Sequence, residues 1–170
     1  MSTRSYFGVE PLRYLGPDAA ASLGYRYYDK DRLVRGKRME DHLRLAVCYW
    51  HTFVGDGADV FGAGTFQRAW HRDPNPLEAA FQKAAAAFEF FEVLGVRYFC
   101  FHDRDVAPEA PTLAETNNVL DRVVDQLGEH MQRTGVRLLW GRPICSRTRG
   151  TCRAPRRTPI PRCSRTPRPR

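Results

Sequence analysis

The chain has 170 residues and a formal net charge of +8, a balance that first suggests a nucleic-acid partner. The charge is uneven, because residues 142–170 hold ten of the 27 Lys and Arg and none of the 19 acids. Residues 1–141 therefore carry a net charge of −2, and the basicity belongs to a tail. The length suffices for one ordinary core, and no apolar run approaches the ~18 residues of a membrane-spanning helix.

Residues 1–38 are mixed and aromatic, and we expect a packed N-terminal extension without a core of its own. A helical turn over residues 40–44 leads into the first predicted strand, residues 45–50, an apolar run that ends at His51. Residues 54–64 contain four glycines and are predicted to form a loop. No Gly-Lys-Ser/Thr follows them, so the loop does not match a phosphate-binding motif.

Two helices follow, each with start and stop signals. The first covers residues 75–94, where Asn75 can cap the helix, Pro76 suits its first position and Gly95 stops it. The second starts at Thr112, which forms a capping box with Glu115, and ends at Gly135. Their predicted inner faces are Leu77, Phe81, Ala84, Phe88, Phe91 and Leu94 in the first helix, and Leu113, Leu120, Val123, Val124, Leu127 and Met131 in the second.

Each helix is followed by a predicted strand, residues 96–101 and 136–140. Gly-Val-Arg opens both strands, forty residues apart, so the two segments have the same place in a repeated β/α unit. Repeated units with continuous apolar strands predict an α/β fold, with a parallel sheet and helices outside it. The sheet could belong to a β/α barrel or to an open sheet, and the pattern favours the barrel slightly. Only about three of a barrel's eight strands are present.

His102 and Asp105 stand at the C-terminal end of the strand over residues 96–101, where α/β proteins place their chemistry. A separation of three residues lets the carboxylate reach one ring nitrogen and leaves the other nitrogen free to move a proton. The alternative is a polar strand end that only solvates the loop. Between them, Asp103 and Arg104 are expected to pair with each other or with neighbours.

The remaining histidines and the aromatic residues allow simpler interpretations. His51 could stack beside a site, although a structural role is favoured, and we expect His42, His71 and His130 at the surface. Trp50, Phe61 and Trp140 lie near strand ends or in the glycine loop, where they could fill the core or form the apolar wall of a sugar pocket. The cysteine spacings match no zinc site, and together with the absence of a signal peptide they predict a reducing, cytoplasmic setting.

Residues 6–141 resemble the N-terminal part of xylose isomerase, of the longer subclass with an extended N-terminus. The resemblance is carried by residues 36–44 (GKRMEDHLR), 49–53 (YWHTF), 61–66 (FGAGTF), 101–109 (FHDRDVAPE) and 112–117 (TLAETN).

The resemblance implies a (β/α)₈ barrel, a homotetramer, and the isomerisation of D-xylose to D-xylulose by a hydride shift. It also implies two divalent cations, Mg²⁺, Mn²⁺ or Co²⁺, which polarise the oxygens of the open-chain sugar. By similarity, His102 assists opening of the sugar ring and Asp105 orients it. Trp50 corresponds to the pocket tryptophan, and Phe61 to the phenylalanine that enters a neighbouring subunit's site.

The chain departs from the family pattern at several points. Val60 and Ala69 stand where the family usually has proline. After Gly141 the family continues with a threonine and an Asn-Leu-Phe-Ser-His-Pro-type segment, whereas this chain continues with Arg142 and Pro143. The family's metal ligands and catalytic lysine lie further on. No metal-binding residue can therefore be assigned, and we expect the chain alone to be inactive.

Residues 142–170 form a tail with ten arginines, six prolines and no acid, and we expect it to be disordered. One alternative function is therefore a non-enzymatic protein that binds nucleic acid through this tail. We hypothesise instead a frameshift near Gly141. With permitted synonymous codons, the neighbouring frame over residues 143–152 encodes Asp-Leu-Phe-Ser-His-Pro-Arg-Tyr-Met, which is family-like. Another metal-dependent sugar-phosphate or nuclease barrel is disfavoured, because nothing in the sequence suggests a phosphate site.

Overall fold

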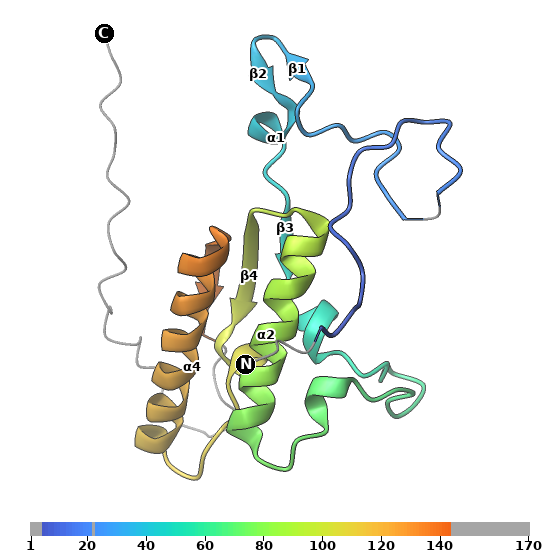
Figure 1. Cartoon of the computed structure of the whole chain (residues 1–170). Coiled ribbons are helices and arrows are strands. Elements are labelled where there is room, and N and C mark those ends of the chain that lie inside the picture. Colours follow the sequence, from blue (N-terminus) through green and yellow to red (C-terminus); the bar gives the residue numbers. More distant parts are fainter. Residues whose placement is uncertain (1–4, 22, 144–170) are drawn as a thin grey trace, which may run out of the picture.

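The computed structural model describes residues 5–21 and 23–143 (Figure 1). The predictions for the tail from residue 144 onward therefore lie outside the described residues. The elements, in chain order, are β1 (Leu33–Val34), β2 (Lys37–Arg38), α1 (Met39–His42), β3 (Ala46–Cys48), η1 (Trp50–Val54), η2 (Ala69–His71), α2 (Pro76–Leu94), β4 (Tyr98–His102), α3 (Asp103–Val106), α4 (Leu113–Thr134) and β5 (Arg137–Arg142).

The centre of the fold is a three-stranded parallel sheet in the order β3-β4-β5. The long helices α2 and α4 connect its strands and lie side by side over one face, as right-handed β/α/β crossovers require (Figure 1). Phe99 of β4 is fully buried on this face and packs against Phe88 and Phe91 of α2, with ring centroids 5.3 Å apart in each case. The described residues thus form the predicted mixed α/β fold.

The sequence signals for the two long helices are confirmed. The side chain of Asn75 accepts the Leu77 N–H at 3.0 Å, and Gly95 ends α2 in the left-handed conformation. Thr112 and Glu115 form both hydrogen bonds of the capping box, and Gly135 ends α4 in the same way as Gly95 ends α2.

The inner face predicted for the second helix is wrong at two positions. Leu113 is 59% exposed and Val124 is 43% exposed. The buried line of α4 runs instead through Thr116, Val123 and Leu127, on the side of the helix that packs against α2 and α3. Leu113 lies before Thr116, the first buried residue of α4. Val124 follows the buried Val123 and therefore faces a different side of the helix.

The first strand is shorter than predicted. Strand β3 ends at Cys48, and the chain then winds into the π-helical turn η1, closed by the Gly55 N–H donating to the Trp50 carbonyl at 3.1 Å. This turn buries Tyr49 and Phe53 completely and brings their rings to 5.0 Å. A straight strand would place the two residues on one face at too great a separation, so burial of both rings favours the turn.

The N-terminal segment is held to the body by hydrogen bonds to α2 along its length, including Leu12 N–H to the Val93 carbonyl at 2.8 Å. The carboxylate of Glu89 on α2 accepts the Ser5 hydroxyl at 2.6 Å and the Tyr6 N–H at 2.8 Å. Further along, the Tyr25 hydroxyl donates to the Leu94 carbonyl at 2.7 Å. The hairpin β1–β2, which was not predicted, stands off the sheet (Figure 1). Its turn contains Arg35 and Gly36, both at positive φ.

Candidate functional site

Because β3, β4 and β5 are parallel, their C-terminal ends meet at one edge of the sheet. His102 is the last residue of β4, and Trp50 follows the end of β3. Trp140 lies in β5 and pairs in register with Cys100, so it shares a sheet face with Cys100 and His102. Three aromatic side chains from three strands thus converge at this edge.

His102 and Asp105 are joined through the helix α3, which the sequence did not predict. His102 is the N-cap of α3, and Asp105 Oδ2 accepts the His102 N–H at 2.7 Å and lies 3.0 Å from Nδ1 of its ring. These hydrogen bonds stabilise α3, which has only four residues. Such a short helix has no repeating pattern of apolar residues from which it could be predicted. The contact between carboxylate and ring that the spacing predicted is therefore present.

The geometry fixes the chemistry available to the imidazole. A carboxylate that accepts a hydrogen bond from Nδ1–H leaves Nε2 unprotonated and free to accept a proton. The Asp105 side chain is only 9% exposed, whereas that of His102 is 25% exposed. The carboxylate is thus shielded from water, while the ring remains accessible to a ligand.

The His102 ring is flanked by two tryptophans. Its centroid lies 4.7 Å from the Trp50 ring and 5.5 Å from the Trp140 ring, and the two tryptophans lie 5.7 Å apart. This aromatic wall comprises Trp50 and Trp140. A place in the site was predicted from the sequence for Trp50, whereas the role of Trp140 stayed open. The available signal was its position near a strand end, and only the parallel register places it beside His102.

Phe61 is not part of the aromatic wall. Its side chain is 93% exposed in the loop between η1 and η2, which projects away from the sheet (Figure 1).

His51 is exposed, with its ring 5.4 Å from Trp50. The surface positions expected for His71 and His130 are wrong, since both side chains are partly buried, whereas His42 is exposed. The predicted pairing of Asp103 with Arg104 is confirmed, at 3.8 Å.

Buried polar groups stand behind the pair. Burial raises the pKa of the Tyr49 hydroxyl, and the negative charge of Asp105 adds to the effect. Burial lowers the pKa of Lys83 to about 8, against the opposing attraction of Asp105. The Lys83 ammonium lies 5.9 Å from the Tyr49 ring centroid. Asp105 therefore acts electrostatically on both the buried Tyr49 hydroxyl and the Lys83 ammonium.

The cysteines of the sheet are unsuited to nucleophilic chemistry. Cys48 and Cys100 are register partners on β3 and β4, and both are free thiols. Burial raises the pKa of each thiol, which keeps the reactive thiolate scarce.

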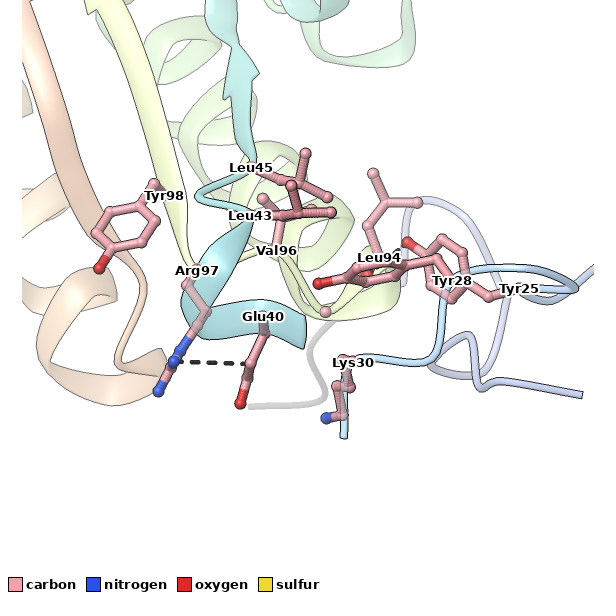
Figure 2. Close-up of a pocket in the computed structure, with 11 residues that line it drawn as sticks. Tyr25, Tyr28, Lys30, Glu40, Leu43, Leu45, Leu94, Val96, Arg97 and Tyr98 are labelled. Atoms are coloured by element: carbon pink, nitrogen blue, oxygen red, sulfur yellow. Dashed lines mark hydrogen bonds and ion pairs between the residues drawn. The ribbon is translucent and has the colours of Figure 1, made fainter. Parts of the chain in front are cut away.

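The opposite end of the sheet holds a small pocket of about 30 Å³ (Figure 2). Glu40 binds Arg38 at 2.7 Å and Arg97 at 3.6 Å there, so the pocket ties α1 to the start of β4. Burial raises the pKa of Tyr25 and of Tyr28, which line it. This pocket lies at the N-terminal ends of the strands, away from His102, and its contacts stabilise the fold.

No group of three or more His, Cys, Asp or Glu within residues 5–21 and 23–143 is placed to hold a metal ion. The divalent cations implied by the resemblance therefore have no ligand set in this part of the chain. In the same ranges, no helix is long and apolar enough to cross a membrane.

Comparison with known proteins shows which family this chain is similar to. The chain is 52% identical over 141 residues to a xylose isomerase of Pseudomonas savastanoi pv. phaseolicola, a match that covers 82% of the chain and 32% of that enzyme. This chain is a partial relative of xylose isomerase. It is likewise 54% identical over 140 residues to the xylose isomerase of Solibacter usitatus, again covering 82% and 32%.

A third relative, the xylose isomerase of Burkholderia thailandensis, is 55% identical over 138 residues, which cover 81% of the chain and 31% of the enzyme. The chain thus spans about a third of the length of the curated xylose isomerases that it matches. No protein-family model matches it.

Proposed function

We propose that this chain carries the proton-transferring pair and one wall of the sugar site of a xylose isomerase, an enzyme that interconverts D-xylose and D-xylulose. The observation that carries the proposal is the imidazole of His102, hydrogen-bonded to a shielded Asp105 and flanked by the aromatic wall. Aromatic faces are suited to the apolar C–H faces of a sugar ring, and the free Nε2 to its hydroxyls.

In the proposed step, the pair opens the pyranose ring. Nε2 of His102 accepts the proton of the anomeric hydroxyl, the bond between C1 and the ring oxygen breaks, and C1 becomes an aldehyde. The imidazolium then returns its proton to the former ring oxygen, which becomes a hydroxyl. Asp105 stabilises the transient imidazolium and holds the ring in position.

The proposed architecture is a partial (β/α)₈ barrel over residues 39–141, preceded by an extension over residues 1–38. The parallel order β3-β4-β5 with α2 and α4 on one face supports it.

The proposed substrate is a small sugar, and the assembly proposed for the complete enzyme is a cytoplasmic homotetramer. Phe61 is proposed to reach a neighbouring subunit's site, because its exposed side chain is free to do so.

The later hydride shift is not assigned to these residues. The complete relatives are proposed to use divalent cations, and the described residues offer no ligand set for them. We therefore expect the 170-residue chain alone to show no conversion of xylose to xylulose with added Mg²⁺ or Mn²⁺. Turnover that purifies with the chain and disappears in His102→Asn would contradict this expectation.

The proton-transfer role is tested in a chimaera that joins residues 1–141 to the remaining segment of the Pseudomonas savastanoi enzyme. His102→Asn should slow isomerisation of D-xylose much more than that of glyceraldehyde, an aldose too short to close a ring. His51→Asn is the matched control, because His51 is exposed beside the same tryptophan. Equal losses on both sugars in His102→Asn would reject ring opening as its role.

A further inference from the structure

A second cleft, separate from the aromatic wall, opens where η2, the first turns of α2 and α3 meet. Its volume is about 310 Å³. Two of the side chains that line it are cations, Lys83 and Arg104, and one is acidic, Asp73. His71 also lines it, but burial and the charge of Lys83 lower the pKa of its ring, which favours the neutral form. Pro76, the first residue of the 19-residue helix α2, also lines it, so the positive end of the helix dipole adds to the basic side chains.

The guanidinium of Arg104 is only partly paired. Its Nε and Nη1 atoms are buried and have no hydrogen-bond partner among the described residues. Its nearest carboxylates are Asp103, 3.8 Å from Nη2, and Glu109, 3.7 Å from Nε, both beyond hydrogen-bond distance. Buried donors normally have an acceptor, so these N–H groups lack a partner that an oxygen ligand would supply.

Lys83 adds a second, partly buried cation to the same cleft. With a pKa lowered to about 8 by burial, against the opposing attraction of Asp105, its ammonium remains largely protonated at pH 7. The ammonium lies 5.9 Å from the centroid of the Tyr49 ring. A buried cation gains from an anionic ligand more than an exposed one does, because water screens the attraction less.

The acidic residue of the cleft is already engaged. Asp73 accepts the Asn75 N–H at 2.9 Å and the Gln82 side-chain amide at 2.8 Å. Its carboxylate therefore holds the entry to α2, and it only partly offsets the basic side chains.

We propose that this cleft binds a small oxyanion, a phosphate or carboxylate group, through the guanidinium of Arg104 and the ammonium of Lys83. The site is distinct from the sugar site proposed above and does not depend on it. Arg104 and Asp105 are neighbours on α3, however, so an occupied cleft would also fix the short helix that carries the carboxylate partner of His102.

The test is titration calorimetry of the full 170-residue chain with inorganic phosphate at pH 7, with sodium chloride at matched ionic strength as reference. Arg104→Gln should weaken phosphate binding at least tenfold. Lys30→Gln is the matched control, because Lys30 is an exposed cation that lines the pocket at the opposite end of the strands, and it should leave binding unchanged. Every variant keeps the basic residues 142–170. Any weak binding of phosphate to these residues is therefore the same in all variants and does not affect the difference between them.

Asp73→Asn provides a test that misfolding cannot imitate. It removes the competing negative charge and keeps an oxygen for the Asn75 N–H, so phosphate should bind severalfold more tightly. Should Arg104→Gln lose its native circular dichroism, Asp73→Asn alone decides the matter. No phosphate binding at millimolar concentration, or one affinity shared by the wild-type chain and both cleft variants, would overturn the proposal.

Discussion

The Nδ1 atom of His102 lies 3.0 Å from the same Asp105 oxygen that accepts the His102 backbone N–H at 2.7 Å. One carboxylate oxygen thus fixes both the start of α3 and the orientation of the imidazole. This double use couples the local fold to the proposed proton transfer, because loss of the Asp105 carboxylate would remove both contacts together.

Asp105→Asn should impair the xylose isomerase chimaera although its shape is nearly unchanged. The amide oxygen can still accept both N–H groups of His102, but the neutral amide no longer stabilises the positive charge of the imidazolium that forms during proton transfer. We expect kcat on D-xylose to fall by about 10²-fold or more, with a smaller loss on glyceraldehyde. Measured rates within twofold of the parent on both sugars would show that the negative charge of Asp105 is unimportant.

Trp140→Ala should weaken sugar binding by the chimaera more than it slows the chemistry. Removal of the indole opens one side of the aromatic wall, where aromatic contacts contribute about 0.5–1.5 kcal/mol each beyond burial. We expect KM for xylose to rise by up to about tenfold, and Trp140→Phe should recover part of the loss. A fall in kcat with KM unchanged would place Trp140 outside the sugar site.

Thr112→Ala should destabilise the chain by about 1 kcal/mol, because it removes the side-chain cap of the 22-residue helix α4. Urea unfolding followed by circular dichroism measures the change. Asn117→Ala is the control, since Asn117 is exposed in the second turn and caps nothing. Equal destabilisation by the two variants would show that the capping box adds nothing special.

Stability should decrease in acid through His130 of α4. Its ring stacks on Phe88 at 4.9 Å, and its Nε2 atom is buried without a partner among the described residues. Burial lowers the pKa of His130, and Arg133 lowers it further, whereas Glu129 and Glu92 oppose the shift. The unfolded chain therefore binds the proton first. The stabilisation is complete above the unfolded pKa, about 6.5, and is lost as the pH falls toward the folded value.

Urea unfolding at pH 7.5 and 5.5 checks this expectation. His130→Phe keeps an aromatic ring for Phe88 to stack on and has no proton to bind, so the variant should lose less stability between the two pH values than the parent does. His42→Phe is the control, because His42 is exposed. The idea is wrong if His130→Phe and the parent show the same pH dependence.

Glu89→Ala should detach the first residues of the extension. The carboxylate binds the Ser5 hydroxyl and the backbone N–H groups of Tyr6 and Phe7, the last at 3.1 Å. Without it, chymotrypsin should cleave after Tyr6 or Phe7 several times faster, which mass spectrometry can locate. Glu92→Ala, one helical turn away and paired instead with Arg133, should leave that cleavage rate unchanged. Slow cleavage in both variants would mean that packing of Tyr6 and Phe7 holds the segment alone.

The long helices and the parallel arrangement of the strands could be predicted from the sequence. Asn75, Gly95, Thr112 and Gly135 are local signals, because a cap or a left-handed residue acts through its own backbone neighbourhood. The separation of His102 from Asp105 likewise predicted their contact, since three residues across a turn leave little freedom. His102 and Asp105 could therefore be assigned to one site without knowledge of the tertiary structure.

The end of β3, the burial of His130 and the place of Trp140 depend instead on contacts between elements that are far apart in the sequence. Tyr49 leaves the strand because burial of its ring with Phe53 favours a turn, a gain that exists only once α2 is in place. Trp140 reaches His102 through the register of two strands joined by a 22-residue helix. The hydrophobic effect that drives such contacts has no direction along the chain, so residues far apart in sequence are brought together only by the packed fold.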